Sequence, residues 1–304
     1  MNEKNVYNGI VNVYKDAGFT SFDVVAKLRG IFGMRKIGHT GTLDPEATGV
    51  LPICLGNATK VVELLMDHDK EYIATLQLGI KTDTQDTTGE ILEEKSTEGL
   101  TEDKVTETIM SFVGDIMQIP PMYSALKVNG QKLCDLARKG VEVERKPRPV
   151  TIHEIEIISI ELPLVTFRVH CSKGTYIRTL CNDIGSKLGC GGAMKTLERT
   201  RVGIFEKNNT LTLQELQRLK DEGRLSQVVS PVDGLFPDYP KLTVCRDGIK
   251  KLENGNKLSS TDYVNQNAIN VHGCVRVYRP DGSFAGIYKR EKTGDIFAPE
   301  KMFL

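Results

Sequence analysis

Gly38-His-Thr-Gly-Thr-Leu-Asp-Pro-Glu-Ala-Thr-Gly49 is the stretch of this sequence with the densest set of special residues. It places Asp44 among glycines, threonines and a proline, with Glu46 as its only other acid. Loops that merely connect elements rarely combine so many backbone-bending residues, whereas loops that bring backbone close to a ligand often do. The stretch therefore predicts a binding or catalytic loop centred on Asp44.

The composition is that of an ordinary globular protein. The chain has 304 residues, of which 39% are hydrophobic and 26% are charged, which suits one large domain with an appendage or two domains. No run of about 18 apolar residues is present, so no transmembrane helix is predicted, and the polar N-terminus does not resemble a secretory signal. The seven cysteines form no Cys-x-x-Cys pair, which argues against a zinc or redox motif. We therefore expect a cytoplasmic protein without a membrane anchor or a bound metal.

Charge is unevenly distributed along the chain, although its net value is zero. Residues 83–115 hold ten acids against two bases, a net charge of −8. Three other segments are basic. Residues 127–150 hold seven bases and three acids (net +4), residues 168–201 hold seven bases and two acids (net +5), and residues 239–304 hold eleven bases and seven acids (net +4). A chain polarised in this way can present a basic face to a polyanion. Charge runs are also common on solvated surfaces, so the pattern permits a nucleic-acid partner without requiring one.

Hydrophobic spacing predicts several helices. Thr20 and Asp23 match a capping box at the start of the first one. The residues expected on its buried face are Phe22, Val25, Leu28 and Phe32. Helices are also predicted over residues 59–66 and 101–113. The apolar residues at helical spacing in a further helix are Leu180, Ile184 and Leu188.

Strand patterns predict a mixed sheet and a separate tail. Residues 72–78 and 165–171 alternate in the manner of half-buried strands, and Pro280-Asp-Gly282 predicts a hairpin turn in the tail. Strands often follow one another directly, which favours an α+β fold with a mainly antiparallel sheet flanked by helices and loops over a doubly wound one.

Two prolines between residues 236 and 240 mark a linker. We expect a catalytic domain over residues 1–236 and a small β-rich domain over residues 240–304. No Gly-x-x-x-x-Gly-Lys-Ser/Thr loop and no Gly-x-Gly-x-x-Gly after a strand is present, so no nucleotide cofactor is predicted.

The segment from Lys36 to Lys60 closely resembles the catalytic segment of the TruB family of tRNA pseudouridine synthases. Further matches follow in the family's order and cover most of residues 8–205: Lys70-Glu-Tyr72, Gly79-Ile-Lys-Thr-Asp-Thr84, Pro121-Met-Tyr-Ser-Ala-Leu-Lys127 and Cys171-Ser-Lys-Gly-Thr-Tyr-Ile-Arg-Thr179. The tail is similar to a PUA-type RNA-binding module. The resemblance implies a pseudouridine synthase-type fold and a tRNA-modifying isomerase.

One turn departs from the family pattern. Members usually have Asp-Lys-Pro-x-Gly before the first helix, whereas this chain has Tyr14-Lys-Asp-Ala-Gly18. The missing proline removes a fixed φ angle, which predicts a less rigid turn and no change in the reaction.

The resemblance assigns catalysis to Asp44, Arg178 and Tyr72. Asp44 is implied to act on the ribose in its ionised form, either by attacking C1′ or by removing a proton from C2′. Arg178 is implied to pair with it, and such a partner lowers an aspartate pKa by about 1–3 units, enough to offset burial. Tyr72 is implied to stack on the target base, a contact worth about 1–3 kcal/mol. The residues expected to bind the substrate are His39, Lys60, Tyr176 and Leu197.

The near-solitary carboxylate also favours isomerisation of a base over hydrolysis. Glycosidases generally need a second carboxyl group to protonate the departing oxygen, whereas uracil leaves as a delocalised anion and is recaptured. Two other functions stay open at this stage. One is an RNA-binding or RNA-folding protein with lost or incidental catalysis, and the other is a ribosyl hydrolase that releases free uracil.

The expected partner is tRNA, bound at its T arm and elbow, with the T-loop uridine at position 55 as the target. A base must leave its stack to react, at a cost of a few kcal/mol. The basic segments 127–150 and 173–201, together with the tail, are expected to contact the RNA. We expect a stand-alone monomer that needs no guide RNA, no organic cofactor and no metal.

Overall fold

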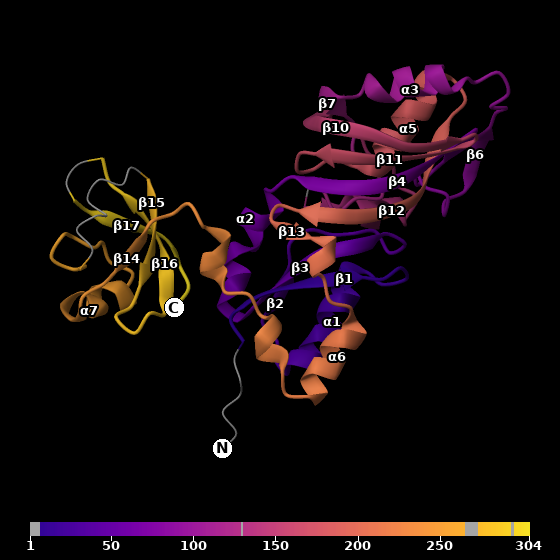
Figure 1. Cartoon of the computed structure of the whole chain (residues 1–304). Helices are drawn as coiled ribbons and strands as arrows, with labels where there is room; N and C mark the ends of the chain where they lie inside the picture. The colour runs from indigo at the N-terminus through magenta and orange to yellow at the C-terminus, as the bar shows by residue number, and fades with distance from the viewer. Residues whose placement is uncertain (1–6, 129, 265–272, 293–294) are drawn as a thin grey trace.

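The computed structural model describes residues 7–128, 130–264, 273–292 and 295–304. Its centre is a nine-stranded sheet with the order β1-β3-β12-β4-β11-β10-β7, in which β2 also pairs with β3 and β13 with β12 (Figure 1). The strands of this sheet are β1 (Gly9–Lys15), β2 (Ile37–His39), β3 (Thr48–Leu55), β4 (Lys70–Leu78), β7 (Gly114–Gln118), β10 (Arg148–Glu161), β11 (Leu164–Cys171), β12 (Gly192–Val202) and β13 (Phe205–Glu206).

The neighbouring strands of this sheet are antiparallel except at one place. There β12 runs parallel to β3, with Glu198 opposite Thr48 and Arg199 opposite Gly49. On its other side β12 is antiparallel to β4. The predicted α+β class with a mainly antiparallel sheet is therefore confirmed. The parallel junction also brings residues far apart in sequence to the same place.

Helices cover two regions of the sheet (Figure 1). Residues of α3 and α5 share a hydrophobic cluster with β4, β10, β11 and β12, whereas α1 and α6 pack with β1 and β3. The helices are α1 (Ser21–Phe32), α2 (Val62–Met66), α3 (Glu102–Met110), α4 (Leu133–Ala137), α5 (Ile177–Leu188), α6 (Leu213–Asp221) and α7 (Ile249–Glu253). No helix among the described residues combines the length and the apolar character needed to cross a bilayer.

Helix α1 begins as predicted but faces the core differently. The Thr20 hydroxyl accepts from the backbone N–H of Asp23, and the Asp23 carboxylate accepts from that of Thr20, which completes the capping box. The expectation that Phe22 is buried is wrong, because its side chain is 63% exposed. The buried stripe instead begins at Ser21 and continues through Val24 one turn later. Phe22 falls outside that stripe because successive helix positions are rotated by about 100°.

Most of the other expected elements are present. Strands β4 and β11 alternate between buried and less buried residues along their whole lengths, and α3 and α5 lie where helices were predicted. The segment 59–66 is divided between the 3-10 helix η1 (Gly56–Val61) and α2. The remaining strands of the larger domain form two small hairpins: β5 (Ile80–Thr82) with β6 (Ile91–Glu94), and β8 (Lys127–Val128) with β9 (Gln131–Lys132).

The C-terminal residues form a small second sheet with the order β14-β15-β16-β17 (Figure 1). Its strands are β14 (Lys241–Thr243), β15 (Cys274–Tyr278), β16 (Phe284–Arg290) and β17 (Phe297–Met302). The predicted turn joins β15 to β16, with Gly282 at φ +86°. A third hydrophobic cluster contains Ile10 and Val61 of the larger domain as well as Ile287 and Phe303. This shared cluster packs the small domain against the large one.

Candidate active site

The Asp44 loop connects β2 to β3 and is bonded to the turn before α1. Buried Lys15 donates from its ammonium group to the carbonyl oxygens of Pro45 (2.9 Å) and Ala47 (2.6 Å). The backbone N–H of Gly18 also donates to the Pro45 oxygen, at 3.0 Å. Burial lowers the pKa of Lys15 to about 8. These bonds hold the turn that lacks the family's proline against the loop.

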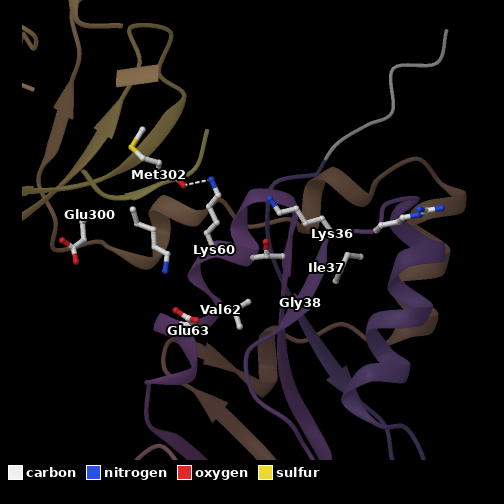
Figure 2. Close-up of a pocket in the computed structure, with 11 residues that line it drawn as sticks. Lys36, Ile37, Gly38, Lys60, Val62, Glu63, Glu300 and Met302 are labelled. Carbon is white, nitrogen blue, oxygen red and sulfur yellow. Dashed lines mark hydrogen bonds between the residues drawn. The ribbon is translucent and has the colours of Figure 1, made fainter. Parts of the chain in front are cut away.

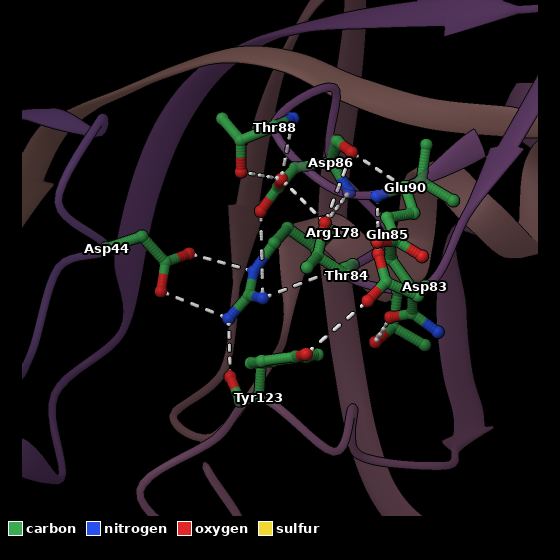
Figure 3. A network of polar contacts seen from close by, with 11 residues as sticks. Asp44, Asp83, Thr84, Gln85, Asp86, Thr88, Glu90, Tyr123 and Arg178 are labelled. Atoms are coloured by element: carbon green, nitrogen blue, oxygen red, sulfur yellow. Dashed lines mark hydrogen bonds and ion pairs between the residues drawn. The ribbon is translucent and has the colours of Figure 1, made fainter. Parts of the chain in front are cut away.

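Arg178 meets Asp44 in a two-point ion pair (Figure 3). Its Nε lies 2.9 Å from Oδ2 of Asp44, and its Nη2 donates to Oδ1 at 3.0 Å. The Arg178 side chain is only 7% exposed, whereas that of Asp44 is 35% exposed. The structure thus brings together the two residues that the resemblance paired, and it leaves the carboxylate accessible to a ligand.

The other donors of Arg178 bind two loops and a second acid. Nη2 donates to the carbonyl oxygen of Tyr123 (2.8 Å) and Nη1 to that of Thr84 (3.2 Å). Nη1 also lies 3.7 Å from Oδ2 of Asp86, a residue that Thr88 hydrogen-bonds through its backbone N–H and hydroxyl (Figure 3). No motif indicates Asp86, which follows the matching segment that ends at Thr84 by two positions and lies in the acidic stretch 83–115.

Burial raises the pKa of Asp44 above the usual 3.8. The charge and hydrogen bonds of Arg178 act in the opposite direction, and the negative charge of Asp86 adds to the rise. The expectation that the arginine offsets burial is therefore wrong. The poorly hydrated surroundings and the second carboxylate outweigh it. Asp44 consequently loses its proton at a higher pH than an ordinary aspartate.

Tyr72 and Leu197 lie in the hydrophobic cluster that reaches the Asp44 loop. Leu43, which directly precedes Asp44, is a member of the same cluster. Tyr72 is 9% exposed and Leu197 8%. Burial raises the pKa of Tyr72 to about 12 despite its hydrogen bond with Arg199. The phenol is therefore neutral at physiological pH.

The side chain of Arg199 holds the Asp44 loop at two points. It is buried, and it donates from Nε to the carbonyl oxygen of Val50 (2.7 Å) and from Nη2 to that of Gly41 (3.2 Å). Because Gly41 and Val50 lie on either side of Asp44, this one side chain fixes the span of the loop. In the sequence, Arg199 is only one of the bases in the segment 168–201. No sequence motif indicates that it supports the Asp44 loop.

His39 and Tyr176 occupy two borders of the site. His39 ends β2 and accepts at Nδ1 from the backbone N–H of Gly41 (3.4 Å), and burial and the charge of Arg199 lower its pKa. Tyr176 precedes α5, and its backbone N–H and C=O bond the side-chain amide of Gln118 at 2.8 and 3.0 Å. Burial raises the pKa of the Tyr176 hydroxyl, which also interacts with Ser124. Tyr176 therefore connects α5 with the end of β7 and with the segment that follows it.

Two family models match adjacent parts of this chain. Their descriptions are the N-terminal domain of TruB family pseudouridylate synthases, over residues 29–177, and the C-terminal domain of tRNA pseudouridylate synthase B, over residues 178–236. The tRNA pseudouridine synthase B of Lachnoclostridium phytofermentans is 52% identical, over 98% of this chain and 100% of that protein. The chain belongs to the TruB family. The protein of the same name from Clostridium tetani is 45% identical, over 94% of this chain and 97% of that protein.

Solved structures share the fold of this TruB-family chain. A chain in the crystal structure of a Cbf5-Nop10-Gar1 complex superposes with a TM-score of 0.72 and 29% identity, over 99% of this chain and 87% of that chain. A chain in the structure of an H/ACA RNP bound to a substrate RNA containing 2′-deoxyuridine superposes with a TM-score of 0.70 and 27% identity, over 98% of this chain and 86% of that chain. Both likenesses extend through the small C-terminal sheet.

Lys60 lies at the junction with the small domain. Its ammonium group donates to the carbonyl oxygen of Met302 (2.9 Å; Figure 2) and to a backbone oxygen of Leu304 (3.4 Å). The surrounding groove has a volume of about 770 Å³ and is lined by Arg35, Lys36 and Lys301, among others. None of these bonds joins Lys60 to Asp44. Among the expected site residues, Lys60 is the one that the structure places elsewhere.

The two basic segments of the TruB-family domain differ in exposure. We call residues 119–147, between β7 and β10, the basic arm. Its exposed bases are Lys127, Lys132, Arg138, Lys139 and Lys146. In the segment 173–201, by contrast, Arg178 and Arg199 are buried and bonded to the Asp44 loop. The expected RNA surface over 173–201 is therefore smaller than its net charge suggests.

Proposed function

We propose that this TruB-family chain is an isomerase that converts uridine 55 in the T loop of tRNA to pseudouridine. The relatives that match nearly the whole chain at 45–52% identity carry the name tRNA pseudouridine synthase B. The observation that carries the proposal is the two-point pairing of Arg178 with Asp44, whose side chain remains 35% exposed. A paired and accessible aspartate in a loop with fixed ends suits attack on a sugar.

In the proposed reaction the Asp44 carboxylate is the main group that the protein supplies. The N1–C1′ bond of the uridine breaks, the uracil turns, and a C5–C1′ bond forms. The proton on C5 is then lost, and N1 gains one. Asp44 either adds to C1′ or removes and returns a proton at C2′, and both routes need its ionised form. Arg178 holds the carboxylate in position by two parallel hydrogen bonds, the geometry that guanidinium groups favour.

The neighbouring residues complete the proposed pocket. Tyr72 and Leu197 provide its apolar wall, where the flipped base stacks on the Tyr72 ring. Tyr176 borders the same space, and His39 contacts the RNA from the other end of the loop. Lys60 is not proposed as part of this pocket, because its ammonium group is bonded to backbone oxygens of the small domain.

The proposed substrate complex uses both domains. The basic arm includes Tyr123, whose carbonyl oxygen is bonded to Arg178, so RNA held by the arm lies beside the active site. Residues 240–304 form a PUA-like domain that extends this contact. We propose that the chain works as a stand-alone monomer without a guide RNA, because relatives that match nearly the whole chain are named for tRNA.

Release of tritium from [5-³H]uridine in a tRNA transcript tests the function. Removing a catalytic nucleophile can lower a rate roughly ten-thousandfold or more, so D44N should bind tRNA normally and release almost no tritium. Equal release by D44N would defeat the proposal. Release by neither protein, with tight binding by both, would favour an RNA-binding or RNA-folding role. Free uracil in the digested product would indicate a hydrolase.

A further inference from the structure

Two histidines and an aspartate meet on the sheet face opposite the active site. His153 comes from β10, His170 from β11, and Asp69 directly precedes β4. Their ligand atoms all lie within 4.8 Å of one another. The neighbours of His170 in β11, Val169 and Cys171, point into the hydrophobic cluster behind the active site. Because side chains alternate along a strand, His170 points to the other face.

The distances in this cluster leave His170 without a direct hydrogen bond to Asp69 and suit a cation shared by all three side chains. Nε2 of His153 lies 3.2 Å from Oδ2 of Asp69, and Nε2 of His170 lies 3.9 Å from the same oxygen. The second distance is too long for a hydrogen bond. Zinc bonds of about 2.0–2.2 Å in tetrahedral geometry separate two ligand atoms by about 3.4 Å. Both distances are close enough to that value for small side-chain movements to close the site.

His170 supplies an independent sign that the cluster binds something. Its Nε2 atom is buried yet has no hydrogen-bond partner, although buried polar atoms are nearly always paired. The same nitrogen points toward Asp69, so a cation between them would supply the missing partner. The side chains of Asp69 and His153 are 46% and 36% exposed, which leaves a route for an ion and room for water as a further ligand.

The strands around the cluster add negative charge. In the sheet register Glu71 of β4 and Glu154 of β10 stand directly opposite His170 on either side. Arg201 forms an ion pair with Glu71 at 3.5 Å, so Glu154 and Asp69 keep the local balance negative. Two imidazoles with one carboxylate are a ligand set typical of zinc and neighbouring transition metals, and a poor one for magnesium or calcium.

We propose that Asp69, His153 and His170 form a binding site for one divalent transition-metal ion, of which zinc is the representative. The site links the start of β4 to the β10–β11 hairpin, so the bound ion holds three neighbouring strands together. It lies apart from Asp44 and takes no part in the proposed isomerisation. A search for cysteine motifs cannot find it, because its ligands come from three separate segments of the chain.

Calorimetric titration of the metal-free, full-length chain with zinc chloride tests this inference. We expect one ion per chain, and a thermal midpoint that rises with zinc but not with magnesium. Removing one ligand should weaken binding by roughly tenfold or more, since even indirect supports of metal sites contribute that much. The variants are D69N and the double substitution H153Q/H170Q. H68Q is the matched control, because His68 adjoins Asp69 in sequence but lies outside the cluster.

Several results would overturn the inference. Zinc affinity equal in the wild type and H153Q/H170Q would exclude the two rings as ligands. An equal loss in H68Q would indicate binding elsewhere, and the absence of any zinc-dependent heat would exclude the site altogether. Should H153Q/H170Q not fold, as judged by circular dichroism in EDTA, D69N decides the question, because it keeps both rings in place and removes only the carboxylate charge.

Discussion

Arg178 uses every side of its guanidinium group at the active site. Nε and Nη2 hold the two oxygens of Asp44, Nη2 also binds the Tyr123 carbonyl, and Nη1 faces Thr84 and Asp86. A lysine has a single ammonium group and cannot reproduce this fork. The arginine therefore positions the carboxylate and also favours its ionised form, although burial outweighs this effect on the pKa.

The pH dependence of the reaction should report on this arrangement. Burial raises the pKa of Asp44, and only the ionised form reacts, so the rate should increase as pH rises through that pKa. R178K weakens the stabilisation of the anion and should move this limb to higher pH, with a lower plateau. D86N removes a nearby negative charge and should move it to lower pH. Single-turnover rates between pH 4 and 8 measure both. Shifts in the same direction for the two variants would contradict this electrostatic picture.

Individual residues were predictable from the sequence only where a motif named them. Asp44 and Arg178 lie in segments that resemble the TruB family, so their pairing was expected across the 134 positions that separate them. Asp86 and Arg199 were missed because their roles arise from burial beside the loop. Burial also raises the pKa of Asp44, whereas the pairing with Arg178 was expected to offset this rise. Neither effect is visible before the chain is folded.

At the scale of elements, local periodicity was sufficient for α1, α5, β4 and β11 but not for β12. That strand carries Leu197 and Arg199, and its pairing is non-local, parallel to β3 and antiparallel to β4. Two register shifts interrupt the ladder between β12 and β4. Because each shift changes which residues face the core, the sequence of β12 does not alternate regularly between apolar and polar residues. The strand that supports the active-site loop is thus one of those that sequence patterns did not show.

The contact between β3 and β12 should be intolerant of a single methyl group. Gly49 has φ +108°, and a Cβ atom there would lie 2.2 Å from the carbonyl oxygen of Arg199. Gly49→Ala should therefore cost about 3 kcal/mol or more, because backbone must move. Gly33→Ala is the control: Gly33 has φ +64° with open space around it and should cost about 1 kcal/mol. Urea unfolding of both variants gives the comparison, and equal losses would argue against the close packing.

The basic arm makes a prediction about RNA binding. Lys127, Lys132 and Lys139 are exposed on it, so their joint replacement by glutamine should weaken tRNA binding and flatten its salt dependence. Each lost phosphate contact reduces the steepness of the fall of log K with log salt by about 0.7–0.9, which gives a reduction of roughly 2 to 3 for three lysines. Filter binding at several salt concentrations measures the slope. K104Q, in the acidic stretch on α3, should leave it unchanged. An unaltered slope in the triple variant would place the RNA elsewhere.

At the scale of the whole molecule, the two sheets are held together by a shared hydrophobic cluster as well as by hydrogen bonds. Ile10 and Val61 from the large domain and Ile287 and Phe303 from the small one belong to it. The side chain of Asn57 adds a hydrogen bond to the Phe303 carbonyl oxygen at 3.0 Å. Domains that share a core in this way are expected to unfold together.

Phe303→Ala should separate the unfolding of the two domains. The ring is 9% exposed and belongs to the cluster that both domains share, so its removal should weaken the contact between the domains by about 2–4 kcal/mol. Scanning calorimetry should show one transition for the wild type and two for the variant. Phe112→Ala lowers packing in a cluster within the large domain alone and should shift the single transition without splitting it. Two transitions already present in the wild type would mean that the shared cluster does not couple the unfolding of the two domains.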